Sequence, residues 1–227
     1  QTIAEVLDRW LRELAGGPEA IDRLLTGTHF VPTIKSWAPD LWRELEGLAR
    51  GANQPFETML AYNLMDEEWS FHSGRMGEAP GCTAIAIEGV GIGQTMDIPS
   101  VHDGSQIVLR MKPVDGPVQI VFTGAGMLAL NGANADGVGV VVNNLSQNPA
   151  SDSGLPVMFV VRSILARRSR ADAVEFVKSV PHAIGQHYLI CGPDGISSLE
   201  AAANGVFDVP LSSCYVHANH PLANGAV

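Results

Sequence analysis

The sequence predicts an α+β protein in which a helical segment precedes two stacked antiparallel sheets with helices outside them. Two observations lead to this fold class. Apolar residues recur at helical spacing in residues 1–81, whereas residues 82–227 hold short apolar runs, rich in Gly, Val and Ala, at the spacing of β-hairpins. The pair Pro80-Gly81 separates the two parts. We therefore expect two units, a helical one over 1–81 and a sheet-bearing one over 82–227.

Three helices are expected in the first unit, which we interpret as a cover for the sheets. Apolar faces run through residues 3–14 and 41–48, and a glycine follows each of them. Pro55 marks the first turn of a third helix. The acidic cluster Asp66-Glu67-Glu68 comes next, and together with Arg75 it could line the cleft, but we favour a solvated helix end because charged clusters are usually solvated.

The second unit alternates between strands and helices. Strands are expected over 82–88, 92–96, 106–112, 117–123 and 137–143, and again over 187–191, 196–202, 206–209 and 214–217. Two helices, over 157–165 and 173–177, interrupt them. This order is typical of two stacked sheets that carry helices on the outside.

Cys82 opens the first strand, directly after Gly81. A glycine before a Cys, Ser or Thr that begins a strand is what self-cleaving precursors need, because the thiol or hydroxyl must attack its own preceding carbonyl. After such a cleavage Cys82 would carry a free α-amino group, with an ordinary pKa of about 8, that can act as the base for its own thiol. The alternative is that Cys82 is a small buried hydrophobic residue without chemistry.

Polar residues stand at the ends of three expected strands. Asp97 closes the motif Gly93-Gln94-Thr95-Met96-Asp97, where a hairpin would bring it near the Cys82 amine, although an Asp before Ile-Pro is also a turn former. Asn143-Asn144 is either a strand terminator or an oxyanion donor. The histidines of His217-Ala218-Asn219-His220 suggest a metal, but no carboxylate or cysteine stands at ligand spacing. We therefore expect no metal and favour Asn219 as an oxyanion donor.

Composition argues against several classes of partner. The net charge of −10 disfavours nucleic acid and anionic membrane surfaces, and no apolar run approaches the roughly 20 residues of a membrane span. Cys82, Cys191 and Cys214 are an odd number at wide spacing, so neither a disulfide framework nor a zinc site is expected. We expect a small-molecule or peptide partner, no cofactor, no membrane partner, and the cytoplasm as the default compartment.

Taken together, these residues resemble the acyl-coenzyme A:6-aminopenicillanic acid acyltransferase (isopenicillin N acyltransferase) family of N-terminal-nucleophile hydrolases, a group that also takes in conjugated bile acid hydrolase-like amidases. The similarity is carried by the segments 39–64 and 134–144, by Gly81-Cys82-Thr83, by the motif that ends at Asp97, and by His217-Ala218-Asn219-His220. It implies a four-layer αββα sandwich of two antiparallel sheets. In that fold, residues 1–81 are the helical pro-segment and residues 82–227 are the fragment that bears the nucleophile.

The resemblance also assigns roles by position. It makes Cys82 the nucleophile, freed by autocleavage after Gly81, and it makes Asp97 the carboxylate that supports the new α-amine. Asn144 falls where the family supplies a backbone oxyanion N–H, and Asn219 where it supplies the side-chain donor. Most members continue beyond the final histidine motif and add an arginine there, so the resemblance implies a sheet unit that is incomplete at its C-terminus.

The function expected from these roles is that of a self-processing cysteine amide hydrolase or acyltransferase, which cleaves an N-acyl amide bond through an S-acyl enzyme. Its expected partners are small-molecule N-acyl amines or acyl thioesters with an apolar acyl group, and association into a homo-oligomer after processing is a further expectation. We expect Ile98, Asn143, Leu145 and His217 to line the substrate site. The alternative is a non-catalytic antiparallel-sheet protein that binds small molecules and contains a buried thiol.

Overall fold

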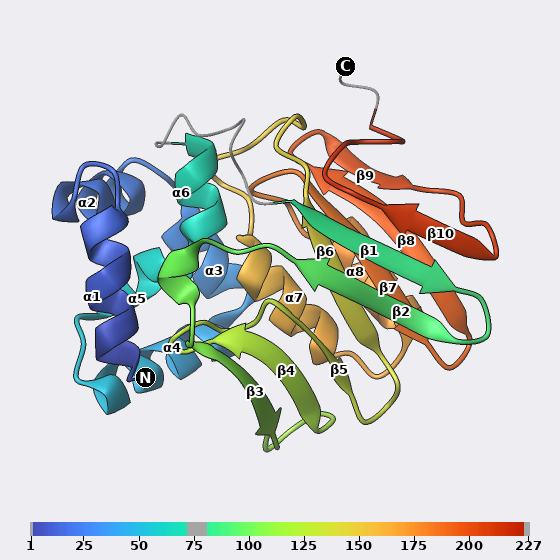
Figure 1. Cartoon of the computed structure of the whole chain (residues 1–227), viewed down its shortest axis with the longest axis horizontal. Coiled ribbons are helices and arrows are strands. Elements are labelled where there is room, and N and C mark those ends of the chain that lie inside the picture. The colour runs from blue at the N-terminus through green and yellow to red at the C-terminus, as the bar shows by residue number, and fades with distance from the viewer. Residues whose placement is uncertain (1, 72–80, 225–227) are drawn as a thin grey trace.

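The computed structural model describes residues 2–71 and 81–224, and the described part of the first unit is helical (Figure 1). Its helices are α1 (Ile3–Glu13), α2 (Pro18–Thr26), α3 (Phe30–Trp37), α4 (Pro39–Ala52), α5 (Phe56–Tyr62) and α6 (Met65–Phe71). The three expected helices correspond to α1, α4 and α5. The other three are short, and their apolar patterns are too brief to be recognised from the sequence. Arg75 and Pro80 lie outside the described residues.

Local signals in the sequence account for several helix ends. Thr2 and Glu5 form a capping box at the start of α1, in which each side chain accepts the backbone N–H of the other. Pro18 and Pro39 stand at the first helical positions of α2 and α4, where a missing N–H costs nothing. Asn53 ends α4 in the left-handed conformation, with φ of 52°.

The second unit forms two antiparallel sheets, as predicted. The strands are β1 (Cys82–Ile87), β2 (Gly91–Met96), β3 (Gln106–Met111), β4 (Gln119–Gly124), β5 (Asn131–Asn134), β6 (Gly139–Asn144), β7 (Gln186–Gly192), β8 (Gly195–Ala202), β9 (Gly205–Asp208) and β10 (Cys214–His217). The small sheet has the order β10-β1-β2, and the large sheet runs from β3 to β9 in sequence order. The expected helices are α7 (Val157–Leu165) and α8 (Arg170–Ser179). Sequence reasoning missed β5, because Asn-Gly-Ala-Asn has no apolar alternation.

Successive residues of the central strands β6 and β7 face opposite layers, since side chains of a strand alternate between its two faces. Val140, Val142 and Ile190 belong to the main core, on the side of the helices. Val141 and Leu189 pack instead with Ala84, Ala86 and Tyr215 of the small sheet in a second, smaller core. The layers are therefore helices, large sheet and small sheet, and β6 and β7 contribute to both interfaces.

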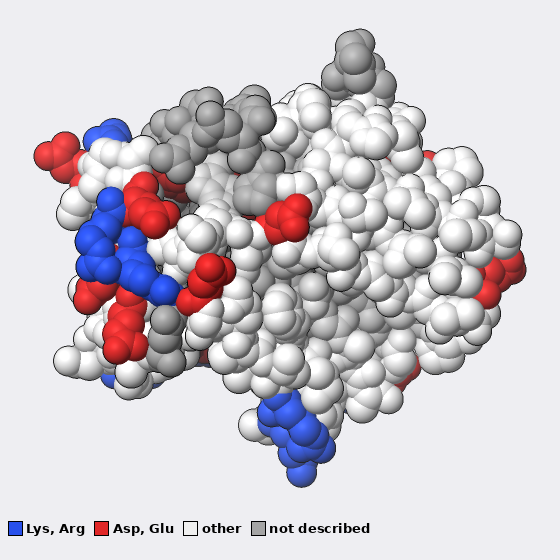
Figure 2. All heavy atoms as spheres, in the orientation of Figure 1, with Lys and Arg blue, Asp and Glu red and all other residues white. Residues whose placement is uncertain are grey.

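The outer face of the small sheet bears apolar side chains, namely Ile85, Ile87 and Val216, which are 36%, 39% and 55% exposed. Within residues 2–71 and 81–224 no helix covers this face, so the described layers are three of the four that the resemblance implies (Figure 1). Few charged side chains lie over β1, β2 and β10, whereas Lys and Arg gather over α1 and beyond the ends of β3 and β4 (Figure 2). None of the helices in the described residues is both long and apolar enough to cross a membrane.

The helical unit is joined to the large sheet by a shared core and by specific polar contacts. Arg162 of α7, 4% exposed, donates two hydrogen bonds of 2.8 Å to the carboxylate of Glu44 on α4. The Asn63 side chain donates to the carbonyl of Gly126 and accepts the N–H of Leu128, at 2.9 and 2.8 Å. These bonds hold α4 and α5 against α7 and the loop before β5, next to the pocket described below.

Candidate active site

Cys82 is the first residue of β1, where the small sheet meets the helical unit. It pairs with Met96 at the end of β2, and its side chain is half-buried. Gln94 of β2 fastens this hairpin to the large sheet, since its amide donates to the carbonyl of Val142 and accepts from Asn131. The thiol therefore has a fixed position at the junction of the two sheets.

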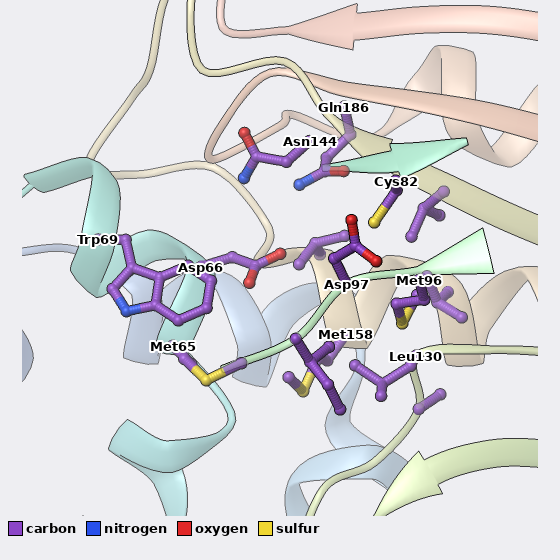
Figure 3. A pocket seen from close by; sticks show the side chains of 15 residues that line it. Met65, Asp66, Trp69, Cys82, Met96, Asp97, Leu130, Asn144, Met158 and Gln186 are labelled. Atoms are coloured by element: carbon purple, nitrogen blue, oxygen red, sulfur yellow. The ribbon is translucent and has the colours of Figure 1, made fainter. Parts of the chain in front are cut away.

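The Cys82 thiol opens into a pocket of about 580 Å³, including its mouth (Figure 3). Most of the wall is apolar and comes from the helical unit, from α7 and from the chain around β5 and β6. These apolar residues are Met65, Trp69, Met96, Ile98, Ala129, Leu130, Val142, Val157, Met158 and Val161. The polar part of the wall consists of Asp66, Asp97, Asn144 and Gln186. Apolar walls with a few convergent polar groups are typical of small-molecule sites.

Asn219 and Asp97 both lie beside the peptide that joins Gly81 to Cys82. The backbone N–H of Cys82 donates to Oδ1 of Asn219 at 2.5 Å. A methyl group placed on Gly81 would lie 3.7 Å from Oδ1 of Asn219 and 3.7 Å from Oδ2 of Asp97. Asp97 and Asn219, two predicted residues that lie far apart along the chain, thus flank the peptide bond before Cys82.

Asn144 lies at the end of β6 with its backbone turned toward Asn219. The backbone N–H of Leu145 donates to the carbonyl of Gly185, which directly precedes β7. Backbone groups of successive residues in a strand point to opposite sides, so the N–H and the carbonyl of Asn144 point away from β7. The carbonyl of Asn144 accepts the side-chain amide of Asn219 at 2.8 Å. The N–H of Asn144 lies on the same side of the strand as that carbonyl, as the predicted role in an oxyanion hole requires.

Burial is the main influence on the titrating groups of the pocket. It raises the pKa of the Cys82 thiol, and the negative charges of Asp66 and Asp97 raise it further. Burial also raises the pKa of Asp66 to about 6, although the nearby amide of Gln186 offsets part of the rise. In the uncut chain the thiol is therefore neutral at pH 7, and it needs a base to become a nucleophile.

Asn143, His217 and Leu145 occupy places other than the predicted one, whereas Ile98 does line the pocket. Asn143 and His217 are 0% and 1% exposed and face the space between the sheets, and Leu145 is completely buried in the turn after β6. The prediction placed His217 on the cleft wall because strand alternation would put it on the same face as Asn219, but β10 ends at His217 and the alternation does not continue to Asn219. Strand alternation turns Asn143 to the opposite face from Asn144.

Asn143 and His187 instead begin a buried polar network between the two sheets. The Asn143 amide donates to the carbonyl of Cys82 at 2.9 Å and accepts from Nδ1 of His187 at 3.0 Å. Nε2 of His187 bonds to Ser198 Oγ at 2.8 Å, and that hydroxyl bonds to Tyr215. Burial, with the neighbouring His217 ring, lowers the pKa of His187 to about 2, so it is a neutral link in this network.

His217 and Glu200 form the second half of the inter-sheet network. The His217 ring stacks on His187 with centroids 3.7 Å apart, and its Nε2 lies 3.0 Å from Glu200 Oε1. The Glu200 carboxylate also accepts three backbone N–H groups from residues 222–224. Among the described residues no group of His, Cys, Asp or Glu is arranged to hold a metal ion. His217 is thus part of the inter-sheet packing.

Sequence reasoning gave less weight to a contribution of α6 to the site than to a solvated helix end. Asp66 and Trp69, one turn apart on α6, line the pocket, and Glu67 and Glu68 are 0% and 4% exposed. The interpretation of residues 66–68 as a solvated helix end is therefore wrong. Glu67 accepts the N–H of Val157 and so caps α7 from another helix, a role that no local pattern reveals.

Comparison with known families identifies the chain. The profile of the acyl-coenzyme A:6-aminopenicillanic acid acyl-transferase family matches residues 88–225, which is more than half of the 227 residues. The chain therefore belongs to this family, whose members are amide hydrolases and acyltransferases of the N-terminal-nucleophile type. The match contains Asp97, Asn144 and Asn219 but begins beyond Cys82.

Two solved structures illustrate the similarity. A Caenorhabditis elegans N-acylethanolamine-hydrolyzing acid amidase (NAAA) ortholog is 15% identical, with a TM-score of 0.47, and the match covers 62% of this chain and 70% of that chain. Penicillin V acylase from Agrobacterium tumefaciens is 13% identical, with a TM-score of 0.33, over 62% of this chain and 42% of that chain. The chain thus spans less than half the length of that acylase. A search of curated protein sequences finds no match.

Proposed function

We propose that this chain is a self-processing cysteine amide hydrolase or acyltransferase, with Cys82 as its N-terminal nucleophile. The observation that carries the proposal is the arrangement around the Gly81–Cys82 peptide. Cys82 contributes a thiol to the pocket wall, Asn219 bonds to its backbone nitrogen, and Asp97 lies beside Gly81. No His lies on the described wall of the pocket, so the new α-amine is the nearest base that processing can supply.

Processing takes place in two steps. The Cys82 sulfur attacks the Gly81 carbonyl, so that a C–S bond forms, the C–N bond breaks, and the thiol proton ends on the Cys82 nitrogen. Water then hydrolyses the thioester, which leaves a carboxylate on Gly81 and a free thiol on Cys82. Asn219 already bonds to the nitrogen that becomes the amine.

In the mature enzyme the free amine takes the proton of the thiol, and the thiolate attacks the carbonyl of an N-acyl amine or acyl thioester. The oxyanion would receive hydrogen bonds from the Asn219 side chain and the Asn144 N–H, and the protonated amine then supplies the proton to the leaving group. Water or an acceptor amine releases the acyl group from sulfur. Hydrolysis and acyl transfer share every step up to that release.

Mass measurement of the purified protein tests the processing step. We expect two fragments that divide before Cys82, an intact chain for Cys82→Ala, and slow processing for Cys82→Ser because a hydroxyl is the weaker nucleophile. Cys191→Ala is the matched control, since Cys191 is also a half-buried thiol in a strand but does not line the pocket. Processing of Cys82→Ala at the wild-type rate would exclude Cys82 as the nucleophile.

A screen of N-acyl amides and acyl thioesters on the processed protein tests the catalytic step. Turnover that disappears on alkylation of Cys82 supports the proposal. The alternative, a binding protein with a buried thiol, predicts an intact chain, no turnover, and slow reaction of Cys82 with thiol reagents.

A further inference from the structure

We propose that the pocket beside Cys82 selects acyl groups that carry a protonated amino group, held by Asp66, Trp69 and Gln186. Neutral acyl groups of the same shape would bind more weakly, and acyl groups that end in a carboxylate would be rejected. This inference rests on the proposed function, because it names the substrate class of the same site.

Gln186 provides the first observation that points to a ligand. Its side chain lines the pocket and is 1% exposed. The amide nitrogen interacts with the Asp66 carboxylate, whereas the amide oxygen has no hydrogen-bond partner among the described residues. A buried amide oxygen without a partner costs free energy of folding, and almost all buried polar groups in proteins are bonded. A ligand that donates to the Gln186 oxygen would satisfy it, as an ammonium or amide N–H does.

Asp66 and Trp69 form the wall opposite the thiol, and they project from the same side of α6 (Figure 3). A carboxylate next to an indole ring is a combination that favours a cation, since the carboxylate supplies charge and the ring face attracts positive charge. Asp66 is half-buried at the pocket wall, so its charge is incompletely screened by water.

The charge balance of the pocket leads to the same conclusion. Among the described residues its wall includes two carboxylates, Asp66 and Asp97, and no Lys, Arg or His. After processing, the Cys82 amine and thiol carry no net charge together, either as free amine with thiol or as ammonium with thiolate. Asp97 lies beside that amine, at Gly81, whereas Asp66 lines another part of the wall. Asp66 is therefore the carboxylate that an ammonium group on an apolar acyl chain would balance.

The test uses amides that share one fluorogenic amine and differ only in the acyl chain. Each ω-amino acyl group of four to six carbons is compared with its unsubstituted analogue and with its ω-carboxy analogue. For processed wild-type protein we expect kcat/KM for the best ω-amino chain to exceed that of the neutral chain by about tenfold, or about 1.4 kcal/mol. The ω-carboxy chain should be the poorest of the three.

Asp66→Asn decides whether the preference comes from the proposed residue, and the readout is the ratio of kcat/KM values within each enzyme. In this variant we expect kcat/KM for the cationic substrate to come within about twofold of kcat/KM for the neutral substrate, because the charge–charge attraction is removed. Glu57→Gln, which removes an exposed carboxylate of α5 outside the pocket, is the matched control and should keep the wild-type ratio. A preference for neutral or carboxylate chains, or an unchanged ratio in Asp66→Asn, would overturn the proposal.

A second measurement separates this proposal from the proposed function, because it needs no amidase activity. Cys82 is labelled with 2-(trimethylammonio)ethyl or 2-sulfonatoethyl methanethiosulfonate, so that the thiolate forms a mixed disulfide and methanesulfinate leaves. Peptide mass spectrometry follows Cys82, and exposed Cys214 is the reference in the same chain. We expect the cationic reagent to be favoured at Cys82 by about tenfold relative to Cys214.

The two measurements therefore allow the proposed function and the selection of cationic acyl groups to be rejected independently. Cationic preference in labelling without turnover of any amide would reject the proposed function and support the electrostatic selection. If both reagents labelled Cys82 at the same rate relative to Cys214, the proposed selection of cationic acyl groups would be overturned, whichever amides the enzyme hydrolyses.

Discussion

Two adjacent rungs of the β6–β7 ladder present polar pairs to opposite faces, and the pairs differ in how completely they are bonded. Asn143 and His187 face the small sheet, where each makes hydrogen bonds at both ends of its side chain. Asn144 and Gln186 form the next rung and face the pocket, where the oxygen of the Gln186 amide has no partner among the described residues. One residue step along the strand separates a network that is complete in itself from a pocket wall whose polar groups are only partly bonded.

The comparison shows how this fold supports Cys82 from one side and leaves it open on the other. The inter-sheet network holds the Cys82 carbonyl, and its cost of burial is offset by its own hydrogen bonds. The pocket contains carboxylates and an amide whose burial is not offset within the described structure, and such groups concentrate at functional sites. Changes on the two faces should therefore affect different quantities, stability on one and turnover on the other.

The largest expected effect lies in the inter-sheet network, at Glu200. Hydrogen bonds to His217 and to the backbone of residues 222–224 outweigh the effect of burial and lower the pKa of Glu200. Glu200→Ala would leave these donors unpaired in a fully buried place, so we expect a loss of about 3–5 kcal/mol in the free energy of unfolding. Urea denaturation measures it, with exposed Glu57→Gln as the control. A loss below about 1 kcal/mol would show that the network is not tightly formed.

The next effect is on turnover, at Asn219. Loss of one oxyanion donor typically lowers the rate by about 100- to 1000-fold, so we expect Asn219→Ala to fall in this range with little change in melting temperature. Kinetics are measured on the processed fraction of each variant. The neighbouring exposed His220, whose ring lies over His217, is the comparison, and His220→Ala should act through stability alone. An active Asn219→Ala protein beside an inactive, well-folded His220→Ala protein would reverse the assignment.

A smaller effect separates the two faces of the ladder directly. Asn143→Ala leaves the Cys82 carbonyl and the His187 Nδ1–H without partners, which should cost on the order of 2 kcal/mol of stability. Gln186→Ala removes an amide whose oxygen is unpaired and whose nitrogen interacts with Asp66 alone, so its stability should stay within about 1 kcal/mol of wild type while substrate binding weakens. Paired denaturation curves check this. Equal losses from both substitutions would contradict the distinction between the faces.

The last effect depends on pH and is smallest for a single unit of pH; it comes from Glu67. Burial, with the charge of Asp66, raises the pKa of Glu67 from 4.5 to about 8, so the folded chain keeps a proton that the unfolded chain releases between these pH values. Over that range the group lowers stability by at most about 1.4 kcal/mol for each unit that the pH rises. Glu67→Gln keeps an acceptor for Val157 and does not titrate, so its advantage over wild type should grow from pH 5 to pH 8. If the free energies of unfolding of wild type and Glu67→Gln changed in parallel with pH, the pKa of Glu67 would not be raised.

Local patterns predicted most strands and the residues around the Gly81–Cys82 peptide. Apolar alternation locates β1, and the short motifs that contain Asp97 and Asn219 carry their own signal. The Asp66 and Gln186 part of the pocket could not be predicted in this way, because it depends on α6 packing against strands more than 100 residues away in sequence. A charge cluster such as 66–68 is usually solvated, and only the tertiary structure shows that it is buried.

The bonds on both sides of Cys82 have a consequence for the processed form that we propose. The Cys82 nitrogen bonds to Asn219 and its carbonyl to Asn143, and β1 lies between β2 and β10. Chain ends normally fray and are shortened by aminopeptidases, which need several residues in an extended, unpaired form. The chain end created before Cys82 would begin inside a sheet, so exopeptidases could not remove the nucleophile without first opening the small sheet.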